Sequence, residues 1–204
     1  LKDRGPVLRA MLVALDRWVS TGREPPESRY PKIADKTLVD VATYQSQFPR
    51  IPGVRLPQTL YTPLRLDMGP RWATEGIADF QAPKVGRPYR TLVPAVDADG
   101  NDVAGIRLPD VAVPVGTYVG WNLRGAACGA EGMLARWTGS YFPFAVTAEA
   151  RIASGDPRPA VRERYPTRAA YLERIARVAA QLRRDGFLLE EDVAQPAAEG
   201  RDLW

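Results

Sequence analysis

The sequence lacks the imidazole on which most nucleophilic catalysis depends. Its 204 residues include no histidine and only one cysteine, Cys128. Serine and cysteine nucleophiles are usually activated by a histidine base, so this chain cannot supply a Ser-His-acid or Cys-His arrangement. Ser140 also lacks the context of a nucleophile elbow, because Thr138 and Phe142 stand where its two glycines should be. We therefore expect no catalytic residue in this chain.

Three aspartates lie within the stretch Asp97–Asp102, a density that invites comparison with a cation-binding loop. An EF-hand loop has Gly at its sixth position and a bidentate Glu at its twelfth. Counted from Asp97, these positions are Asp102 and Leu108, so the pattern fails at both. The Asp-Gly and Gly-Asn pairs instead suit a tight turn, and we expect a β-hairpin with its tip near Gly100. No metal site is expected, since one cysteine without histidine does not make a zinc site either.

Another group of residues has the chemistry to bind rather than to react. Tyr118, Trp121 and Asn122 lie in the glycine-rich stretch Gly116–Gly125. An aromatic ring beside a fixed amide can line a pocket and orient a polar ligand, so these three are candidate substrate-pocket residues. In the alternative interpretation, the tryptophan buries its ring at a domain seam and the asparagine satisfies a turn. Because pockets are few in any protein, we favour this alternative.

Two amphipathic helices are predicted near the ends of the chain. In the first, between Pro6 and Ser20, apolar residues recur three and four positions apart, and Gly22 suits its end. This helix has one wide apolar face that needs a partner surface; it includes Leu8, Leu12, Leu15 and Trp18. The second helix is predicted over residues 168–184, with Thr167 as its N-cap. Its apolar stripe consists of Tyr171, Ile175, Val178, Ala179 and Leu182.

Much of the remaining chain is expected to be irregular. The sequence contains 19 prolines, which argue against a self-contained repeating sheet and suit a segment that wraps around a scaffold. The predicted hairpin, with strands at Thr91–Val93 and Val103–Ile106, is the main exception. The expected fold class within this chain is therefore mixed α+β, with long N- and C-terminal helices, a β-hairpin and much proline-rich irregular structure.

Charge and hydropathy exclude two classes of partner. The net charge is +4 and the pI is about 9.4, but the basic residues are scattered among acids, whereas a nucleic-acid binder clusters them on one face. We therefore expect no nucleic-acid partner. No apolar run approaches the roughly 20 residues of a membrane helix, so no membrane span is expected. The single cysteine excludes an internal disulfide and assigns no compartment.

A series of short motifs runs in order along nearly the whole chain. They are Leu8–Val19, Glu24–Pro31, Val93–Asn101, Gly105–Pro109, Gly116–Leu123, Gly139–Phe144, Gly155–Pro159 and Arg164-Tyr165. As an ordered set they resemble the C-terminal part of a large bacterial family of α/β-hydrolase-domain proteins.

The resemblance implies an α/β fold for the complete protein and divides this chain into four parts. Residues 1–22 would be the closing helix of a hydrolase core, and residues 23–86 a proline-rich wrapping segment. Residues 87–146 would form a hairpin and loop extension, and residues 147–204 a C-terminal helical segment. In such hydrolases the order is nucleophile, acid and histidine, so the serine and the histidine would lie upstream of this chain.

The resemblance also implies a function. The complete protein would hydrolyse carboxylic esters or related acyl bonds of small molecules through a covalent serine intermediate, without a cofactor. This chain alone would be inactive, and its partner would be an N-terminal hydrolase polypeptide that carries the serine and the histidine. Leu8, Leu12, Leu15 and Trp18 would then form the partner interface. The alternative is an independent, non-catalytic binding or structural module.

Overall fold

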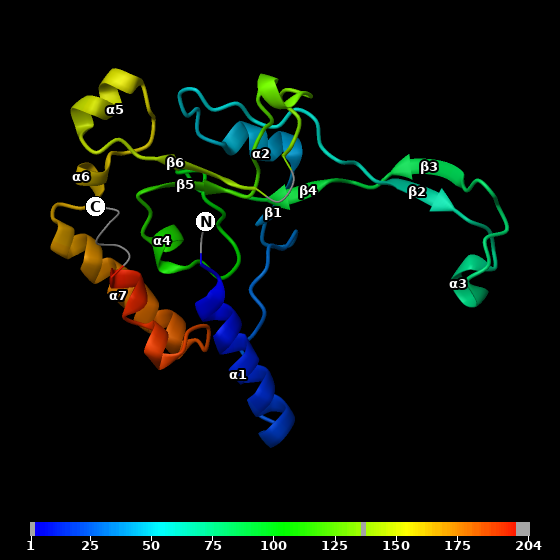
Figure 1. Ribbon diagram of the computed structural model, residues 1–204, viewed down its shortest axis with the longest axis horizontal. Helices are drawn as coiled ribbons and strands as arrows, with labels where there is room; N and C mark the ends of the chain where they lie inside the picture. Colours follow the sequence, from blue (N-terminus) through cyan, green and yellow to red (C-terminus); the bar gives the residue numbers. More distant parts are fainter. Residues whose placement is uncertain (1–2, 136–137, 199–204) are drawn as a thin grey trace.

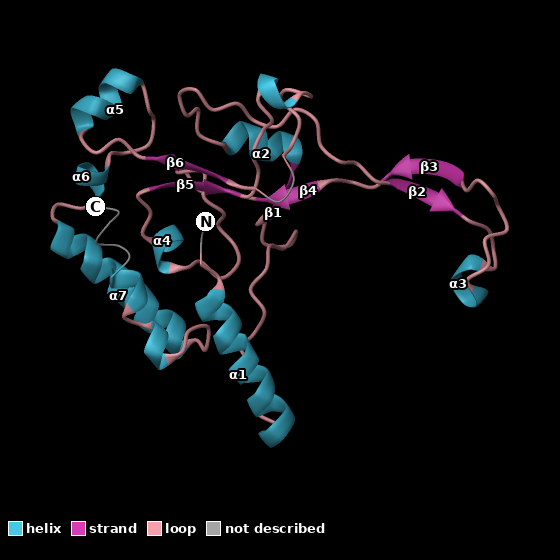
Figure 2. Ribbon diagram, in the orientation of Figure 1, coloured by secondary structure: helices cyan, strands magenta, loops and turns pink. Residues whose placement is uncertain are grey.

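The computed structural model describes residues 3–135 and 138–198, which form a mixed α/β structure (Figures 1 and 2). The strands are β1 (Leu38–Asp40), β2 (Leu64–Asp67), β3 (Lys84–Pro88), β4 (Leu92–Pro94), β5 (Gly116–Val119) and β6 (Ser140–Pro143). The helices are α1 (Gly5–Thr21), α2 (Val41–Gln47), α3 (Trp72–Glu75), α4 (Pro109–Ala112), α5 (Ala148–Ser154), α6 (Val161–Arg164) and α7 (Arg168–Arg184). Two 3-10 turns, η1 (Ala126–Cys128) and η2 (Glu190–Asp192), complete the elements.

The strands pair into small antiparallel sheets. Over the described residues, the pairs are β1 with β4, β2 with β3, and β5 with β6, each a sheet of two strands. A two-stranded sheet is marginally stable by itself and needs another layer on one of its faces. The helices provide that layer for part of the molecule, so the sheets do not form one central core.

The main core lies along α7, as the sequence predicted. Thr167 caps this helix by accepting a hydrogen bond from the Ala170 amide at 3.1 Å. The side chains of its predicted stripe are buried, apart from the partly buried Val178. They form two clusters together with residues just before β5, just after β6 and in the turn after α7. The buried residues of these clusters are Val113, Val115, Phe144, Val161, Tyr165, Tyr171, Ile175, Ala179, Leu182, Phe187 and Leu188.

Helix α1 has the predicted span, and its wide apolar face is covered only in part. Gly22, with φ of 74°, ends it and donates its amide to the Trp18 carbonyl at 2.9 Å. Val7 and Met11 pack against the cluster at the C-terminal end of α7. Other apolar residues of the helix point away from that cluster. The structure therefore divides the wide face into an inner and an outer row.

The predicted hairpin is correct at its turn and wrong in one strand. The Asp97 amide donates to the Asn101 carbonyl at 2.8 Å, and Gly100 has φ of 82°. The strand expected at Val103–Ile106 does not form. After one hydrogen bond from Val103, the backbone bends away at Gly105, where φ is 94°. Instead β4 pairs with the distant β1.

Strands β2 and β3 form an arm, residues 64–88 including α3, that stands away from the rest of the molecule (Figure 1). The arm belongs to the proline-rich stretch that was expected to wrap around a scaffold. Every residue of both strands is exposed. The described part of the chain therefore supplies no surface for the arm to pack on.

Replacing Ile175 by alanine tests the position of the core. Ile175 is 1% exposed, and its truncation leaves a cavity among the residues packed around α7. We expect the free energy of unfolding, measured by urea denaturation, to fall by about 2–5 kcal/mol. Arg177→Ala, at an exposed position of the same helix, is the control and is expected to change it little. Equal effects of the two substitutions would contradict this core.

Candidate functional site

The outer side of α1 carries a row of large apolar side chains that nothing in the described chain covers. We call Leu8, Leu12, Leu15 and Trp18 the outer row. Their exposed fractions are 65%, 67%, 50% and 50%. Soluble proteins rarely expose a contiguous apolar patch of this kind unless it binds something. The outer row is thus a candidate binding surface.

The inner side of α1 fixes the helix and so presents the outer row in one orientation. Ala10 is 3% exposed, and Val7 and Met11 contact the Leu182 cluster. The Arg9 guanidinium donates to Asp192 in η2 at 2.5 Å. The Asp192 side chain is only 6% exposed, so this ion pair ties α1 to a buried carboxylate. The outer row therefore lies on a helix that is already held on its opposite side.

A groove of about 590 Å³ lies between α1 and the turn that follows α7. Ala10, Val13 and Ala14 line it on the α1 side, and the stretch Arg183–Glu190 lines the other side. Arg183 pairs with Glu190 across this turn. The residues around the groove include no serine, cysteine or tyrosine. It offers carboxylates and arginines but no hydroxyl or thiol nucleophile, which is the chemistry of a binding surface.

The structure does not place the three candidate pocket residues around this groove. Tyr118 stacks on Tyr141 with ring centroids 4.7 Å apart, and burial raises its pKa. The Trp121 ring packs at the seam between α2 and the β5–β6 sheet, and its Nε1 donates to the Tyr44 hydroxyl at 2.9 Å. Asn122 is exposed, and its Oδ1 accepts from the Leu123 amide at 2.8 Å. Their role in substrate binding stays a prediction.

The aspartates of the turn at residues 97–102 are largely occupied by protein donors. Asp97 accepts from the amides of Asp99 and Asn101, each at 3.0 Å, and from Arg107 at 2.9 Å. Asp99 forms a bidentate pair with Arg164. Within residues 3–135 and 138–198, no group of three or more His, Cys, Asp or Glu side chains is placed to hold a metal ion. These carboxylates therefore act in the fold.

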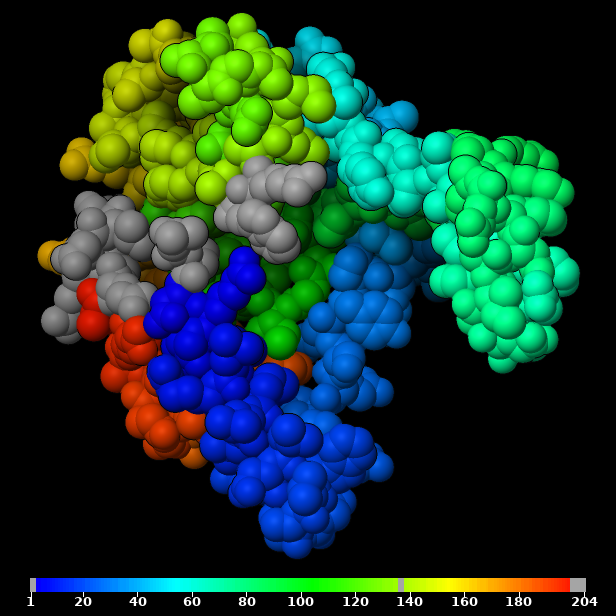
Figure 3. Space-filling model, turned by 45° about the vertical axis from the view of Figure 1, so that its right-hand side comes forward, coloured from blue at the N-terminus to red at the C-terminus, as the bar shows by residue number. Residues whose placement is uncertain are grey.

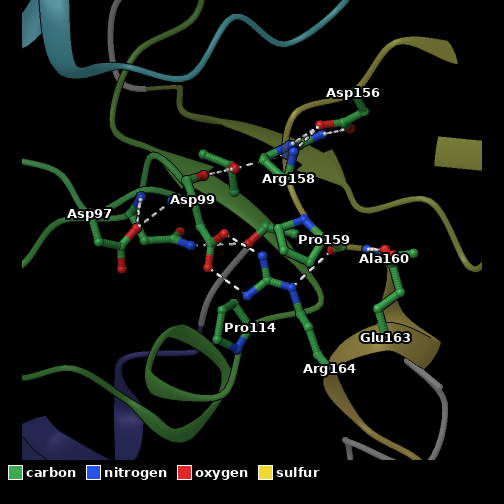
Figure 4. Close-up of polar contacts among 12 residues, drawn as sticks. Asp97, Asp99, Pro114, Asp156, Arg158, Pro159, Ala160, Glu163 and Arg164 are labelled. Carbon is green, nitrogen blue, oxygen red and sulfur yellow. Dashed lines mark hydrogen bonds and ion pairs between the residues drawn. The ribbon is translucent and has the colours of Figure 1, made fainter. Parts of the chain in front are cut away.

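Sequence reasoning missed Arg158, a deeply buried charged residue. Its side chain is 2% exposed, and it binds both carboxylate oxygens of Asp156, at 2.9 and 2.6 Å (Figure 4). The same guanidinium donates to the Thr117 hydroxyl in β5 at 2.8 Å and to the Phe142 carbonyl in β6 at 2.9 Å. The spacing Asp-Pro-Arg was the available signal. Arg158 thereby joins both strands of one sheet to the loop before α6.

Two other buried polar residues extend this network. The Asn101 side chain is 0% exposed; its amide donates to the Gly116 carbonyl at 3.2 Å, and its Oδ1 accepts from the Tyr118 amide at 2.8 Å. The Thr117 hydroxyl donates to the Asp99 carbonyl. The aspartate-rich turn is thus joined to the β5–β6 sheet. The two side chains considered above as nucleophiles are not placed against a base: Ser140 donates to the Trp121 carbonyl at 2.9 Å, and Cys128 is exposed in η1.

Two opposing effects set the pKa of Asp156. Burial raises the pKa, whereas the hydrogen bonds and the charge of Arg158 lower it, and the net pKa lies below the ordinary value of an aspartate. The folded state therefore favours the charged carboxylate. The stability gained is present above the ordinary pKa of about 4 and is lost as the pH falls through the lower value of the folded state.

Comparison with known proteins supports the motif series found in the sequence. The model of one protein family, described as "Alpha/beta hydrolase domain", matches residues 3–198. The matched range includes α1, the arm and the whole described C-terminal region. No curated protein and no solved structure matches the chain. Among the residues that the structure describes, none of the helices is both long and apolar enough to span a membrane.

Substituting Arg158 by methionine tests the buried network. The variant leaves the Asp156 carboxylate buried without its cation, which costs about 3–5 kcal/mol of unfolding free energy. Chemical denaturation at pH 7 measures this loss. Arg162→Met, which removes an exposed guanidinium four residues further on, is the matched control and is expected to unfold nearly as the wild type does.

The same variant predicts a pH dependence of definite sign. Without the Arg158 guanidinium, burial is opposed only by the residue-158 backbone amide and the charge of Arg151, so the pKa of Asp156 rises and protonation in acid relieves part of the defect. The difference in unfolding free energy between wild type and Arg158→Met should therefore be larger at pH 7 than at pH 3. A difference that is equal at the two pH values, or larger at pH 3, would contradict the assigned ion pair.

Proposed function

Because the chain belongs to the alpha/beta hydrolase domain family, we propose that it is one part of a serine hydrolase that cleaves carboxylic esters or related acyl bonds. In this proposal the chain docks, through the outer row of α1, on a polypeptide that carries the nucleophilic serine and the histidine. The chain contributes structure to the assembly and no catalytic residue.

The observation that carries the proposal is the exposure of the outer row on an otherwise anchored helix. Leu12 is 67% exposed, while the opposite side of the same helix is packed on the Leu182 cluster and tied by Arg9 to Asp192. A helix whose wide apolar face is covered only in part by one layer usually packs the rest of that face on a second layer. The described chain supplies one of these layers, and the partner would supply the other.

A hydrolase sheet suits the missing layer. In α/β proteins, helices cover both faces of a mostly parallel sheet. The sheets among the described residues are two-stranded and antiparallel, so none of them has that form. A partner that contributes a parallel sheet would cover the outer row as an ordinary helix-on-sheet contact.

The side-chain chemistry of this chain indicates that the reacting groups belong to the partner polypeptide. A serine nucleophile needs a base and an oxyanion hole around one reacting carbonyl. The sequence has no histidine, and Ser140 donates its hydroxyl proton to the Trp121 carbonyl instead of contacting a base. The reacting groups are therefore assigned to the partner. Tyr118, Trp121 and Asn122 are retained as proposed contributors to the wall of the substrate pocket.

Fluorophosphonate labelling of the tagged chain, purified gently from cells that express it naturally, tests the proposal. On a denaturing gel we expect the label on a co-purifying polypeptide and none on this 22.5 kDa chain. A Leu12→Glu variant should lose the labelled companion, because the substitution puts a charge in the centre of an apolar contact.

Ile152→Glu is the matched control, since Ile152 on α5 is 69% exposed and lies outside the outer row. It should retain the companion. Label on the 22.5 kDa chain itself, or a companion retained equally by Leu12→Glu and the control, would overturn the proposal. A chain that purifies alone and folded would favour the alternative, a binding or structural module without catalysis.

A further inference from the structure

The groove beside α1 lies on the side of the helix that the outer row does not use. Ala10, Val13 and Arg17 line it from α1. These residues recur three and four positions apart, so at about 3.6 residues per turn they share one side of the helix, opposite the outer row. The facing wall belongs to the segment that follows α7, which lies beside α1 in both views (Figures 1 and 3). A partner on the outer row would therefore leave the groove open.

The third wall of the groove is the segment that follows α1, and it is fixed on the turn after α7. Arg29 donates to Asp185 at 2.7 Å, and its guanidinium lies 4.5 Å from the centroid of the Phe187 ring. Pro26 approaches Gly186 so closely that a Cβ at position 186 would lie 2.7 Å from the Pro26 Cγ. Gly186 also has φ of 83°, which favours glycine. These contacts hold the walls in place, as in a pre-formed ligand site.

Two of the three carboxylates that line the groove are already neutralised. Glu190 pairs with Arg183, and Asp185 pairs with Arg29. The hydrogen bond from Arg29 lowers the pKa of Asp185, so this group stays a carboxylate that is occupied by its own cation. Glu24 is the third lining carboxylate, and it forms no ion pair within the described part of the chain.

The arginines of the groove exceed this remaining negative charge. Arg17 and Arg23 both line the groove, and neither forms an ion pair within residues 3–135 and 138–198. Arg184 donates to the neutral side chain of Gln181 at 2.6 Å. Three guanidinium groups thus stand against the single free carboxylate of Glu24. Because guanidinium groups bind carboxylate and phosphate with two parallel hydrogen bonds, the groove favours an anion of one of these kinds.

Along α1 the groove changes from apolar to cationic. Ala10 and Ala14 precede Arg17, and the rise from residue 10 to residue 17 is about 10 Å at roughly 1.5 Å per residue. Leu188, which is 4% exposed, lines the same groove from the turn after α7. The volume of about 590 Å³ is within the range of small-molecule sites. An anionic head with an apolar chain matches this order of side chains.

From these observations we infer that the groove binds an organic anion, a carboxylate or phosphate carried on an aliphatic chain. Arg17 and Arg23 bind the anionic head, and the chain packs on Ala10, Ala14 and Leu188. The inference does not depend on the proposed function, because the groove and the outer row lie on different sides of α1.

Isothermal titration calorimetry of the chain with octanoate and with octyl phosphate tests the inference. Both probes are used below the concentrations at which they form micelles. We expect saturable binding, and the tighter of the two probes identifies the head group. Octanol has the same chain without the charge and should bind much more weakly. In the series butanoate, hexanoate and octanoate, binding should tighten by up to about fourfold for each buried methylene.

Variants of the two unpaired arginines locate the binding site. Arg17→Gln and Arg23→Gln should each weaken octanoate binding about tenfold, because each removes a charge-assisted hydrogen bond. Arg50→Gln is the matched control, since Arg50 is also an exposed arginine without an ion pair in the described chain and lies outside the groove. It should bind as the wild type does. All three side chains are exposed, so urea denaturation should give the wild-type midpoint for each variant.

The contrary outcomes are specific. Absence of saturable binding by both probes would overturn the inference. Octanol that binds as tightly as octanoate would show that the arginines recognise nothing, and inorganic phosphate that binds as tightly as octyl phosphate would show that the chain has no site. An equal loss of binding in Arg50→Gln and Arg17→Gln would assign the effect to the net charge of the protein and not to this groove.

Discussion

The ion pair between Arg158 and Asp156 is the interaction on which the rest of the structure depends. A buried guanidinium is stable only when its charge is paired and its N–H groups are satisfied, and here donors reach a carboxylate, a hydroxyl and backbone carbonyls. These acceptors come from β5, β6 and the loop before α6. The pair therefore sets the β5–β6 sheet against the C-terminal helices. The Asn101 side chain is hydrogen-bonded to the backbone of the same sheet, and these bonds fix the aspartate-rich turn.

The same C-terminal region determines how α1 is presented. The Leu182 cluster and Asp192 hold its inner side, so the outer row stays exposed on a helix that cannot turn it inward. In the proposed function, the complement of this surface is the sheet of an alpha/beta hydrolase. The arm stands apart from α1 across an open space and also carries exposed apolar side chains (Figure 3). We interpret α7 as the centre of the chain's own core, and we propose that a partner covers the apolar surfaces that this core leaves exposed.

The sequence predicted the elements whose stability is local and missed those that depend on distant contacts. Periodicity and caps located α1 and α7, because apolar spacing and end residues act within the helix itself. The pairing of β4 with β1 joins residues far apart in the chain, and no local signal specifies it. Helix α5, capped by Thr147, was not located individually, because its seven residues carry little apolar periodicity. Arg158 was missed because the Asp-Pro-Arg spacing that pairs it with Asp156 is short and the other arginines are scattered among acids in the same way. The sequence predicted the outer row as part of a face that needs a partner; its side chains are exposed, and its role as an interface stays a prediction. Periodicity did not separate it from the inner row, because periodicity does not show which part of a face meets which layer.

The most direct test of the account is photo-cross-linking from position 12 in the native cell. A photoreactive amino acid replaces Leu12, whose side chain lies in the middle of the outer row and is 67% exposed. The account predicts a single major cross-link to the polypeptide that reacts with fluorophosphonate, and mass spectrometry of the product should place it on the surface of that polypeptide's sheet. Cross-links to a second copy of this chain, or to no protein at all, would contradict the central claim that α1 docks on a serine hydrolase.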